Sequence, residues 1–160
     1  HNTLCLNQLI PSGFLNMNFS ERIFSRLELI PDCIARLTKK IRHLLLSKED
    51  LFDIKLCLQE ALVNAVKHGN KFDPGLVVEC SVEVSGNRLT IQVRDQGEGF
   101  DDQAVPSPVH TENLTKTSGR GVYLIKKLMD EVEFFDRGRG VKMTKFFNKE
   151  THREPKRRET

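Results

Sequence analysis

The stretch from Glu60 to Lys71, EALVNAVKHGNK, places a carboxylate and a carboxamide four residues apart. Residues i and i+4 of a helix share one face, so Glu60 and Asn64 lie on the same side of this helix, with His68 one turn further on. Such a polar row is not expected on a helix that is buried in an apolar core. It suits a site for a hydrated divalent cation beside a phosphate, because magnesium takes oxygen ligands and is usually shared between one or two protein groups and a nucleotide. The stretch therefore predicts a helix that carries part of a metal and phosphate site.

This helix is expected to run from about residue 49 to residue 68. Ser47 is its N-cap candidate, with Asp50 as an acidic variant of the capping box, and Gly69-Asn70 supplies the stop. Its core face is marked by five apolar residues, Leu51, Ile54, Leu58, Leu62 and Ala65. Upstream, residues 22–29 alternate in part and predict a strand, which ends before a second helix with Asp32 as N-cap. The apolar stripe of that second helix is Ile34, Leu37, Ile41, Leu44 and Leu45.

The residues that follow the polar helix alternate between apolar and polar side chains. Residues 77–84 and 89–93 predict two antiparallel strands, joined by the hairpin turn Ser85-Gly86-Asn87. A short helix over residues 121–129 and two more strands, over 131–136 and 141–148, complete the pattern. Residues 96–118 have almost no periodicity, and a loop of that length inside a small domain is usually functional, such as a lid.

Two glycine motifs flank this long loop. The first, DQGEG at residues 95–99, directly follows a strand. Its glycines let the backbone turn sharply, and its carboxylate can accept a hydrogen bond from an exocyclic amine such as that of adenine. The second, SGRG at residues 118–121, opens a helix, where free N–H groups attract phosphate. Each motif alone is weak evidence, because hairpins, calcium loops and ordinary helix starts contain the same glycines, and the chain has no P-loop.

Length and composition indicate one compact domain. The chain has 160 residues, of which 38% are hydrophobic, and a net charge of +3. We expect an N-terminal arm over residues 1–20, one folded domain over 21–149 and a disordered basic tail over 150–160. No apolar run approaches the roughly 18 residues that span a membrane, and the basic tail is interpreted as solvated, without a direct nucleic-acid role. The four cysteines form no CxxC pair, which is typical of reduced thiols in a cytoplasmic protein.

The order of these motifs resembles the Bergerat-fold ATPases, the superfamily of gyrase, the Hsp90 chaperones, histidine kinases and MutL. The match covers about residues 51–147, and the N-terminal strand and helix together with EALVNAVKHGN are similar to one branch, the anti-sigma factor serine/threonine kinases. The resemblance implies an α+β two-layer sandwich, in which a mixed, mostly antiparallel sheet carries helices on one face and a long ATP lid.

The resemblance also implies the cofactors, ATP and Mg²⁺, and a role for each matching residue. Asn64 matches the magnesium ligand, Glu60 the carboxylate that acts as general base or orients the attacking group, and Asp95 the reader of the adenine amine. The glycines of the two boxes match turns around the base, ribose and phosphates: Gly97 and Gly99 in the first, Gly119 and Gly121 with Arg120 in the second.

Some positions stay open. Lys116 and Arg120 are candidates for contact with the γ-phosphate, and for His68 and Gly69 a site role and a structural role are both possible. One departure concerns the last strand, where many superfamily members carry Gly-Thr and this chain has Gly140-Val141. Thr144 lies three residues on and faces the other way. Adenine binding is therefore expected to be weaker or differently supported.

The first functional hypothesis is an ATP-dependent protein serine/threonine kinase. The resemblance implies that it phosphorylates a STAS-type anti-sigma factor antagonist, binds a sigma factor and forms a homodimer. The second hypothesis is the catalytic domain of a sensor histidine kinase, against which Glu60 argues, because histidine kinases usually carry Asn there. His43 also lacks the acidic neighbour expected of a phospho-acceptor histidine. A third hypothesis is a non-catalytic module that binds a partner under the control of ADP or ATP.

Overall fold

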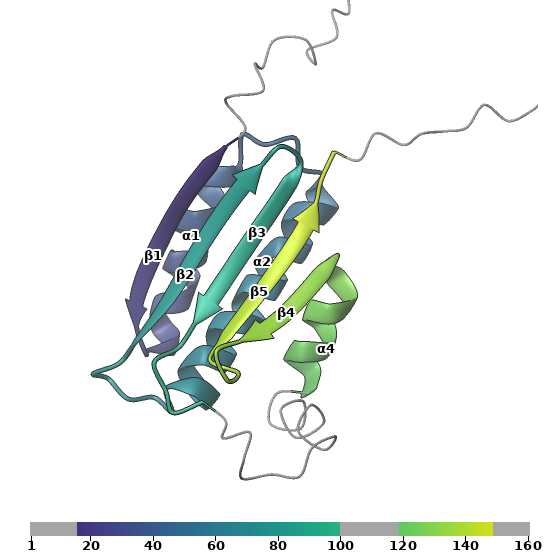
Figure 1. The fold of residues 1–160 in the computed structure, drawn as a ribbon. Coiled ribbons are helices and arrows are strands. Elements are labelled where there is room, and N and C mark those ends of the chain that lie inside the picture. The colour runs from purple at the N-terminus through teal and green to yellow at the C-terminus, as the bar shows by residue number, and fades with distance from the viewer. Residues whose placement is uncertain (1–15, 100–118, 149–160) are drawn as a thin grey trace, which may run out of the picture.

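The computed structural model describes residues 16–99 and 119–148, which form one sheet with helices packed against it (Figure 1). The sheet has five strands in the order β1-β2-β3-β5-β4. Its strands are β1 (Met17–Phe24), β2 (Val77–Ser85), β3 (Arg88–Arg94), β4 (Glu131–Phe135) and β5 (Gly140–Phe146). All four strand pairs are antiparallel, so the expectation of a mixed sheet is not met in the described part of the chain.

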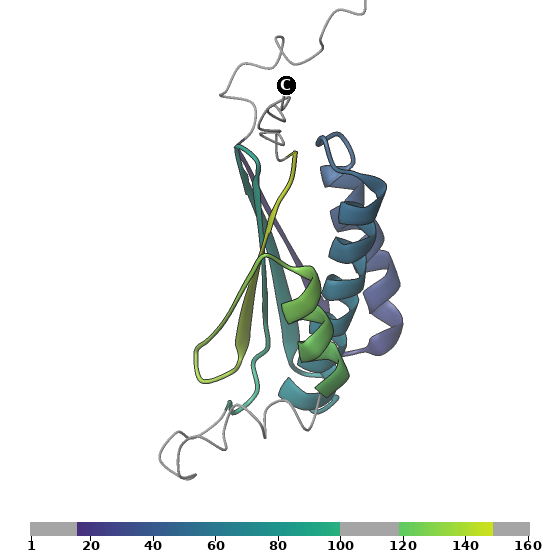
Figure 2. The same cartoon turned by 90° about the vertical axis from the view of Figure 1, so that its right-hand side faces the viewer.

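The helices lie on one face of the sheet, which confirms the predicted two-layer α+β arrangement (Figure 2). They are a 3-10 turn (η3, Leu27–Leu29), α1 (Ile30–Ile41), α2 (Lys48–Asn64), a π-helical turn (η4, Ala65–Gly69) and α4 (Gly119–Leu128). None of the helices within these residues combines the length and the apolar character needed to cross a membrane. The expected lid falls almost entirely on residues 100–118, which lie outside the described residues, as do the first 15 residues and the basic tail.

The first strand differs from its prediction. It begins at Met17 and ends at Phe24, where residues 22–29 were expected, and it pairs with β2 along its whole length. The expected boundary of the N-terminal arm at residue 20 therefore falls inside a strand of the domain. The alternation is hard to recognise because this edge strand is only half buried and Glu21 occupies a position on its inner face.

The two long helices begin as their local chemistry dictates, although one cap was predicted wrongly. Helix α1 begins at Ile30 with Pro31 in its first turn, so Asp32 lies inside the first turn and is not the N-cap. Leu45 lies beyond this helix and is 55% exposed, so it is not part of the apolar stripe. The Ser47 cap is confirmed, because its side chain accepts the backbone N–H of Asp50 at 2.9 Å.

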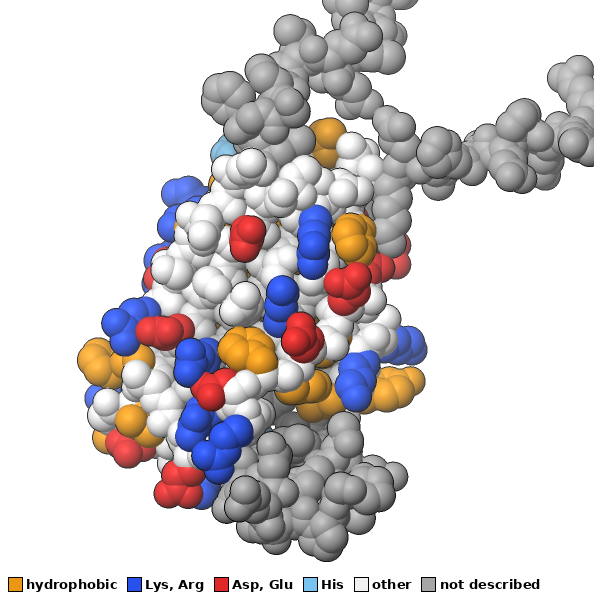
Figure 3. Space-filling view, viewed as in Figure 1, with side chains coloured by type: hydrophobic (Ala, Val, Ile, Leu, Met, Phe, Trp, Pro, Cys, Tyr) orange, Lys and Arg blue, Asp and Glu red, His pale blue; other side chains and the backbone are white. Residues whose placement is uncertain are grey.

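The core fills the space between the helices and the inner face of the sheet. Ile54, Leu58 and Leu62 of α2 are buried there, as the periodicity predicted. Three of the cysteines are free and buried in the same layer, and burial raises the pKa of the Cys57 thiol to about 12. The opposite face of the sheet is open and carries side chains of both charges, among them the pair Arg22–Glu79 at 3.1 Å (Figure 3).

A buried ion pair joins three elements at one end of this core. Lys145 of β5 lies 3.2 Å from Asp53 of α2, and its ammonium group also donates to the carbonyl of Leu128 at the end of α4 at 2.7 Å. Both charged side chains are almost fully buried. The cation therefore ties the last turn of α4 to α2 and fixes how α4 lies against the sheet.

Replacement of Lys145 by alanine is expected to lower the free energy of unfolding by about 3–5 kcal/mol, because it leaves the Asp53 carboxylate buried without its partner. Urea denaturation measures the change. Lys142→Ala is the matched control, since Lys142 lies on the same strand but on the open face. Equal stability of the two variants would show that the buried pair contributes nothing specific.

Candidate functional site

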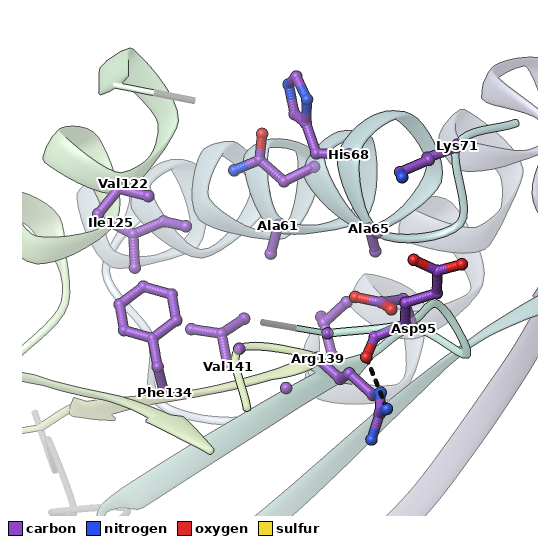
Figure 4. Close-up of a pocket in the computed structure, with 17 residues that line it drawn as sticks. Ala61, Ala65, His68, Lys71, Asp95, Val122, Ile125, Phe134, Arg139 and Val141 are labelled. Atoms are coloured by element: carbon purple, nitrogen blue, oxygen red, sulfur yellow. Dashed lines mark hydrogen bonds between the residues drawn. The ribbon is translucent and has the colours of Figure 1, made fainter. Parts of the chain in front are cut away.

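A pocket lies between the C-terminal half of α2, the first turns of α4 and the inner face of β3, β4 and β5 (Figure 4). Its walls are apolar on three sides. Ala61 and Ala65 come from the helix layer, Val122 and Ile125 from α4, and Phe134 and Val141 from the sheet. A narrow apolar slot of this kind suits the two faces of a flat aromatic base.

One carboxylate in the wall of the slot is buried. Asp95 is only 7% exposed, and its Oδ1 accepts the backbone N–H of Gly97 at 2.8 Å. Burial raises the pKa of the Asp95 carboxyl above its ordinary value, although the Gly97 hydrogen bond and nearby Arg139 act in the opposite direction. A buried carboxylate needs a hydrogen-bond donor, and the exocyclic amine of a base in the slot would supply one.

Two glycines are required by the close packing around this carboxylate. A Cβ added at Gly69 would lie 2.3 Å from Cγ of Asp95, and one added at Gly97 would lie 2.1 Å from the carbonyl oxygen of Gly69. The end of the polar helix and the first glycine box therefore touch through their backbones. For Gly69, left open by the sequence, the structure assigns a structural role beside the site residue Asp95.

Arg139 is a site residue that the sequence analysis missed. Its guanidinium donates to the carbonyl oxygens of Gly97 and Glu98, each at 2.8 Å, and the backbone N–H of Asp95 donates to the Arg139 carbonyl at 3.0 Å. These contacts hold the first glycine box against the β4–β5 turn. No sequence motif marks Arg139, because it lies in the turn RGRG and contacts a loop that is far away in the sequence.

The polar row on α2 meets the second glycine box at the other end of the pocket. A Cβ added at Gly121 would lie 2.8 Å from Oε2 of Glu60 and 3.0 Å from Nδ2 of Asn64. The structure thus brings together the three residues, from two helices, that the sequence analysis assigned to the metal and phosphate end. Asn64 lines the pocket itself, whereas Glu60 stands beside it, against Gly121.

The remaining candidate residues from the sequence analysis are not held against the pocket in this way. Within the described residues, a Cβ added at Gly119 would have no atom within 4 Å, and Arg120 is exposed; both lie in the first turn of α4. His68 borders the pocket, but its ring is exposed and points away from Asp95 (Figure 4). Lys116 lies outside the described residues. His43 is exposed in the turn after α1 and not on a helix.

The position that departs from Gly-Thr lies in the wall of the pocket. The Val141 side chain lines the pocket and is 8% exposed, on the strand next to β3, which Asp95 directly follows. Thr144 projects to the other face of β5, where it pairs with Thr90. The pocket therefore has a carboxylate and an aliphatic wall, without a hydroxyl at position 141.

The donor set fits a nucleotide that brings its own magnesium ion. Among the residues that the structure describes, no three His, Cys, Asp or Glu side chains gather into a site that could hold a metal alone. Asn64 with the neighbouring Glu60 offers one or two oxygen groups, which is the number that Mg²⁺ takes from a protein when phosphates and waters supply the rest. The helix N-terminus at Gly119–Gly121 offers N–H groups for those phosphates.

Comparison with known proteins agrees with this geometry. Residues 23–145 match the family model of the histidine kinase-like ATPase domain. The serine-protein kinase RsbW of Bacillus licheniformis is 40% identical over 111 residues, which cover 65% of this chain and 69% of the relative. RsbW of Bacillus subtilis is 36% identical over 109 residues, covering 64% and 68%, and RsbW of Staphylococcus epidermidis is 35% identical over 112 residues, covering 65% and 70%.

A solved structure shows the same fold. A crystal structure of the RsbU and RsbW domains of a Mycobacterium tuberculosis protein superposes with a TM-score of 0.54 at 16% identity, over 82% of this chain and 32% of that chain. The ATPase-like fold, the pocket and the related sequences lead to one assignment: the chain belongs to the histidine kinase-like ATPase domain family, in the branch of the RsbW serine-protein kinases.

Proposed function

We propose that this chain is an ATP-dependent protein serine/threonine kinase and acts as an anti-sigma factor. The observation that carries the proposal is the placement of Glu60 and Asn64 against Gly121, beside a pocket that Asn64 and Asp95 both line. In this proposal Asp95 marks the base-reading end of the pocket, and Asn64 with Gly121 marks the phosphate end, where the Glu60 carboxylate stands beside the pocket. The name of the relatives, serine-protein kinase, supports the same reaction.

In this proposal the chain's own residues bind and orient ATP. The Asp95 carboxylate accepts the adenine amine, the apolar walls hold the ring, and the N–H groups of Gly119–Gly121 hold the phosphates. Asn64 would hold Mg²⁺, which supplies charge neutralisation on the phosphates when bound. Glu60 accepts the proton of a serine or threonine hydroxyl as the hydroxyl oxygen attacks the γ-phosphorus of ATP, and ADP leaves.

The carboxylate at position 60 favours a hydroxyl acceptor over an imidazole. A hydroxyl must lose its proton as it becomes a phosphate ester, and an adjacent base makes that loss possible near neutral pH. A neutral imidazole nitrogen attacks with a free lone pair and needs no such base. We therefore propose a hydroxyl as the acceptor. The similarity to the RsbW serine-protein kinases is the basis for proposing also a STAS-type antagonist as the protein that carries it, a sigma factor as second partner, a homodimer as assembly and the cytoplasm as location.

Asn64→Ala is expected to weaken ATP binding about tenfold or more in the presence of magnesium, because one protein ligand of the ion is lost. Binding without magnesium should change little. Titration of a fluorescent ATP analogue with and without EDTA separates the magnesium-dependent affinity from the affinity without magnesium. The control is Lys67→Ala, because Lys67 is exposed and lies in η4, directly after α2. An unchanged affinity in magnesium would refute the assigned role.

ATP binding is expected to weaken as the pH falls through the raised pKa of Asp95. The charged carboxylate is the stronger acceptor for the adenine amine, and it is lost on protonation. Folding responds in the opposite direction, because an acid with a raised pKa in the folded state contributes stability at low pH that is lost as the pH rises through that value. Affinity measured from pH 7 down to pH 4.5 tests this, and the pH-dependent step should vanish in Asp95→Asn.

Transfer itself is tested by purifying the chain with the proteins that bind to it and adding γ-labelled ATP with Mg²⁺. The proposal expects label on a small co-purifying STAS-type protein, within minutes, and none on the chain. ATP binding without any labelled protein would instead favour a module that only binds its partner.

A further inference from the structure

The amide side chain of Asn70 lies at the centre of a buried network that the nucleotide contacts do not use. Asn70 is 2% exposed and directly follows the π-helical turn. Its Nδ2 donates to Oγ of Ser25 at 2.7 Å and to the carbonyl oxygen of Val77 at 2.9 Å. Its Oδ1 accepts the backbone N–H of Gln96 at 2.8 Å. Two donors and an acceptor in one plane are what a carboxamide offers, and no other side chain of this size does so.

The last of these bonds reaches the residue between Asp95 and Gly97. The peptide N–H of Gln96 is fixed by Asn70, and the Gln96 side chain in turn accepts the backbone N–H of Val77 at 2.9 Å. Arg139 also holds this loop, through the carbonyl of Gly97. The first glycine box is thus held by two side chains that come from segments far apart in the sequence.

The backbone beside Asn70 is held in an uncommon conformation. Lys71 and Phe72 both have left-handed φ values, 50° and 59°, although neither is glycine. Such residues persist only where the surrounding structure over-determines them. The bonds of Asn70, together with the backbone bond from Phe72 to the Val66 carbonyl at 2.9 Å, supply that determination.

We propose that Asn70 is a positioning residue for base recognition: it holds the Gln96 peptide and thereby keeps the Asp95 carboxylate in the position from which it accepts the amine of the base. Asn70 does not touch the nucleotide and acts through the loop. The proposal rests on the proposed nucleotide binding. The same network reaches Ser25, which directly follows β1, so it also joins the N-terminal strand to the base-reading loop.

The test compares base preference, which a general loss of stability would not change. ATP and GTP affinities are measured for the wild type, Asn70→Leu and Asn70→Asp at a temperature where each is folded. Leucine keeps the shape and removes all three bonds, and we expect about tenfold weaker ATP binding with GTP binding nearly unchanged, the effect of roughly one well-placed hydrogen bond. Aspartate retains the acceptor for Gln96, so it should keep more of the preference for ATP than leucine does.

Thr38→Ala is the control for stability. Thr38 is a buried hydroxyl that bonds within α1 at 2.8 Å, away from the pocket. It should lower stability and leave the ratio of ATP to GTP affinity unchanged. An Asn70→Leu protein that keeps the wild-type ratio would overturn the proposal. A wild type without preference for ATP would instead overturn the proposed nucleotide function.

A measurement on the wild type covers the case in which the Asn70 variants do not fold. Amide hydrogen exchange without nucleotide should show the Gln96 N–H protected to a degree similar to that of the Val77 N–H, because both are held by side chains of this network. Exchange of Gln96 at the rate of an open loop would mean that Asn70 does not hold the peptide, and would contradict the proposal.

Discussion

Glu60→Ala is expected to lower the rate of phosphate transfer by about 10²–10⁴-fold, the usual contribution of a general base, while ATP remains bound. The structure separates the two effects, because Glu60 stands against Gly121 at the phosphate end and does not line the base slot. The variant should therefore change kcat strongly and the affinity for ATP by less than about threefold, the pattern of an interaction made only in the transition state.

Two further variants sharpen this expectation. Glu60→Gln keeps the size and a hydrogen-bonding oxygen but cannot take a proton, so it should be nearly as slow as alanine if the carboxylate is a base. Recovery of most of the activity in the glutamine variant would show that Glu60 only orients the acceptor. Glu49→Ala is the control, because Glu49 is an exposed carboxylate in the first turn of the same helix.

Asp95→Asn is expected to weaken ATP binding about 10- to 100-fold, the range for a lost hydrogen bond to a charged group. The oxygen of the new amide replaces Oδ1 as acceptor for the Gly97 N–H. The NH₂ group of the same amide then points toward the adenine amine, so that two donors face each other. The fold should not lose stability at pH 7, because burial disfavours the charged carboxylate that the variant removes.

The matched control for this prediction is Asp73→Asn. Asp73 accepts the backbone N–H of Gly75 at 2.9 Å, the same local bond that Asp95 makes to Gly97, but in an exposed turn away from the pocket. Its variant should bind ATP like the wild type. If Asp95→Asn binds ATP as tightly as this control, the carboxylate does not read the base.

The parts of the fold that local chemistry determines were predictable from sequence. The Ser47 cap, the hairpin at Gly86 and the strands β2 and β3 are set by short-range patterns, and all agree with the structure. The polar row at Glu60 and Asn64 and the carboxylate at Asp95 were predictable as candidates for the same reason. That these residues gather in and beside one pocket was implied only by the resemblance to known ATPases, since no spacing rule brings α2 and α4 together.

The parts that tertiary contacts determine were missed. The first strand is an edge strand with a polar residue on its inner face, so its alternation is weak before its pairing with β2 is known. Arg139 and Asn70 act through backbone groups far away in sequence, and nothing in their neighbourhood marks them. Gly69 was left open because a Cβ clash with Asp95 exists only once the chain is folded.

The central claim, transfer of phosphate from ATP to a hydroxyl, is tested most directly by the chemical stability of the transferred label. The wild type and Glu60→Ala are incubated with γ-labelled ATP, Mg²⁺ and the co-purified partner, and the labelled protein is treated with acid and with alkali. The account predicts an acid-stable, alkali-labile label on serine or threonine of the partner, made by the wild type and almost absent with Glu60→Ala. An acid-labile label on histidine, or equal labelling by both proteins, would contradict it.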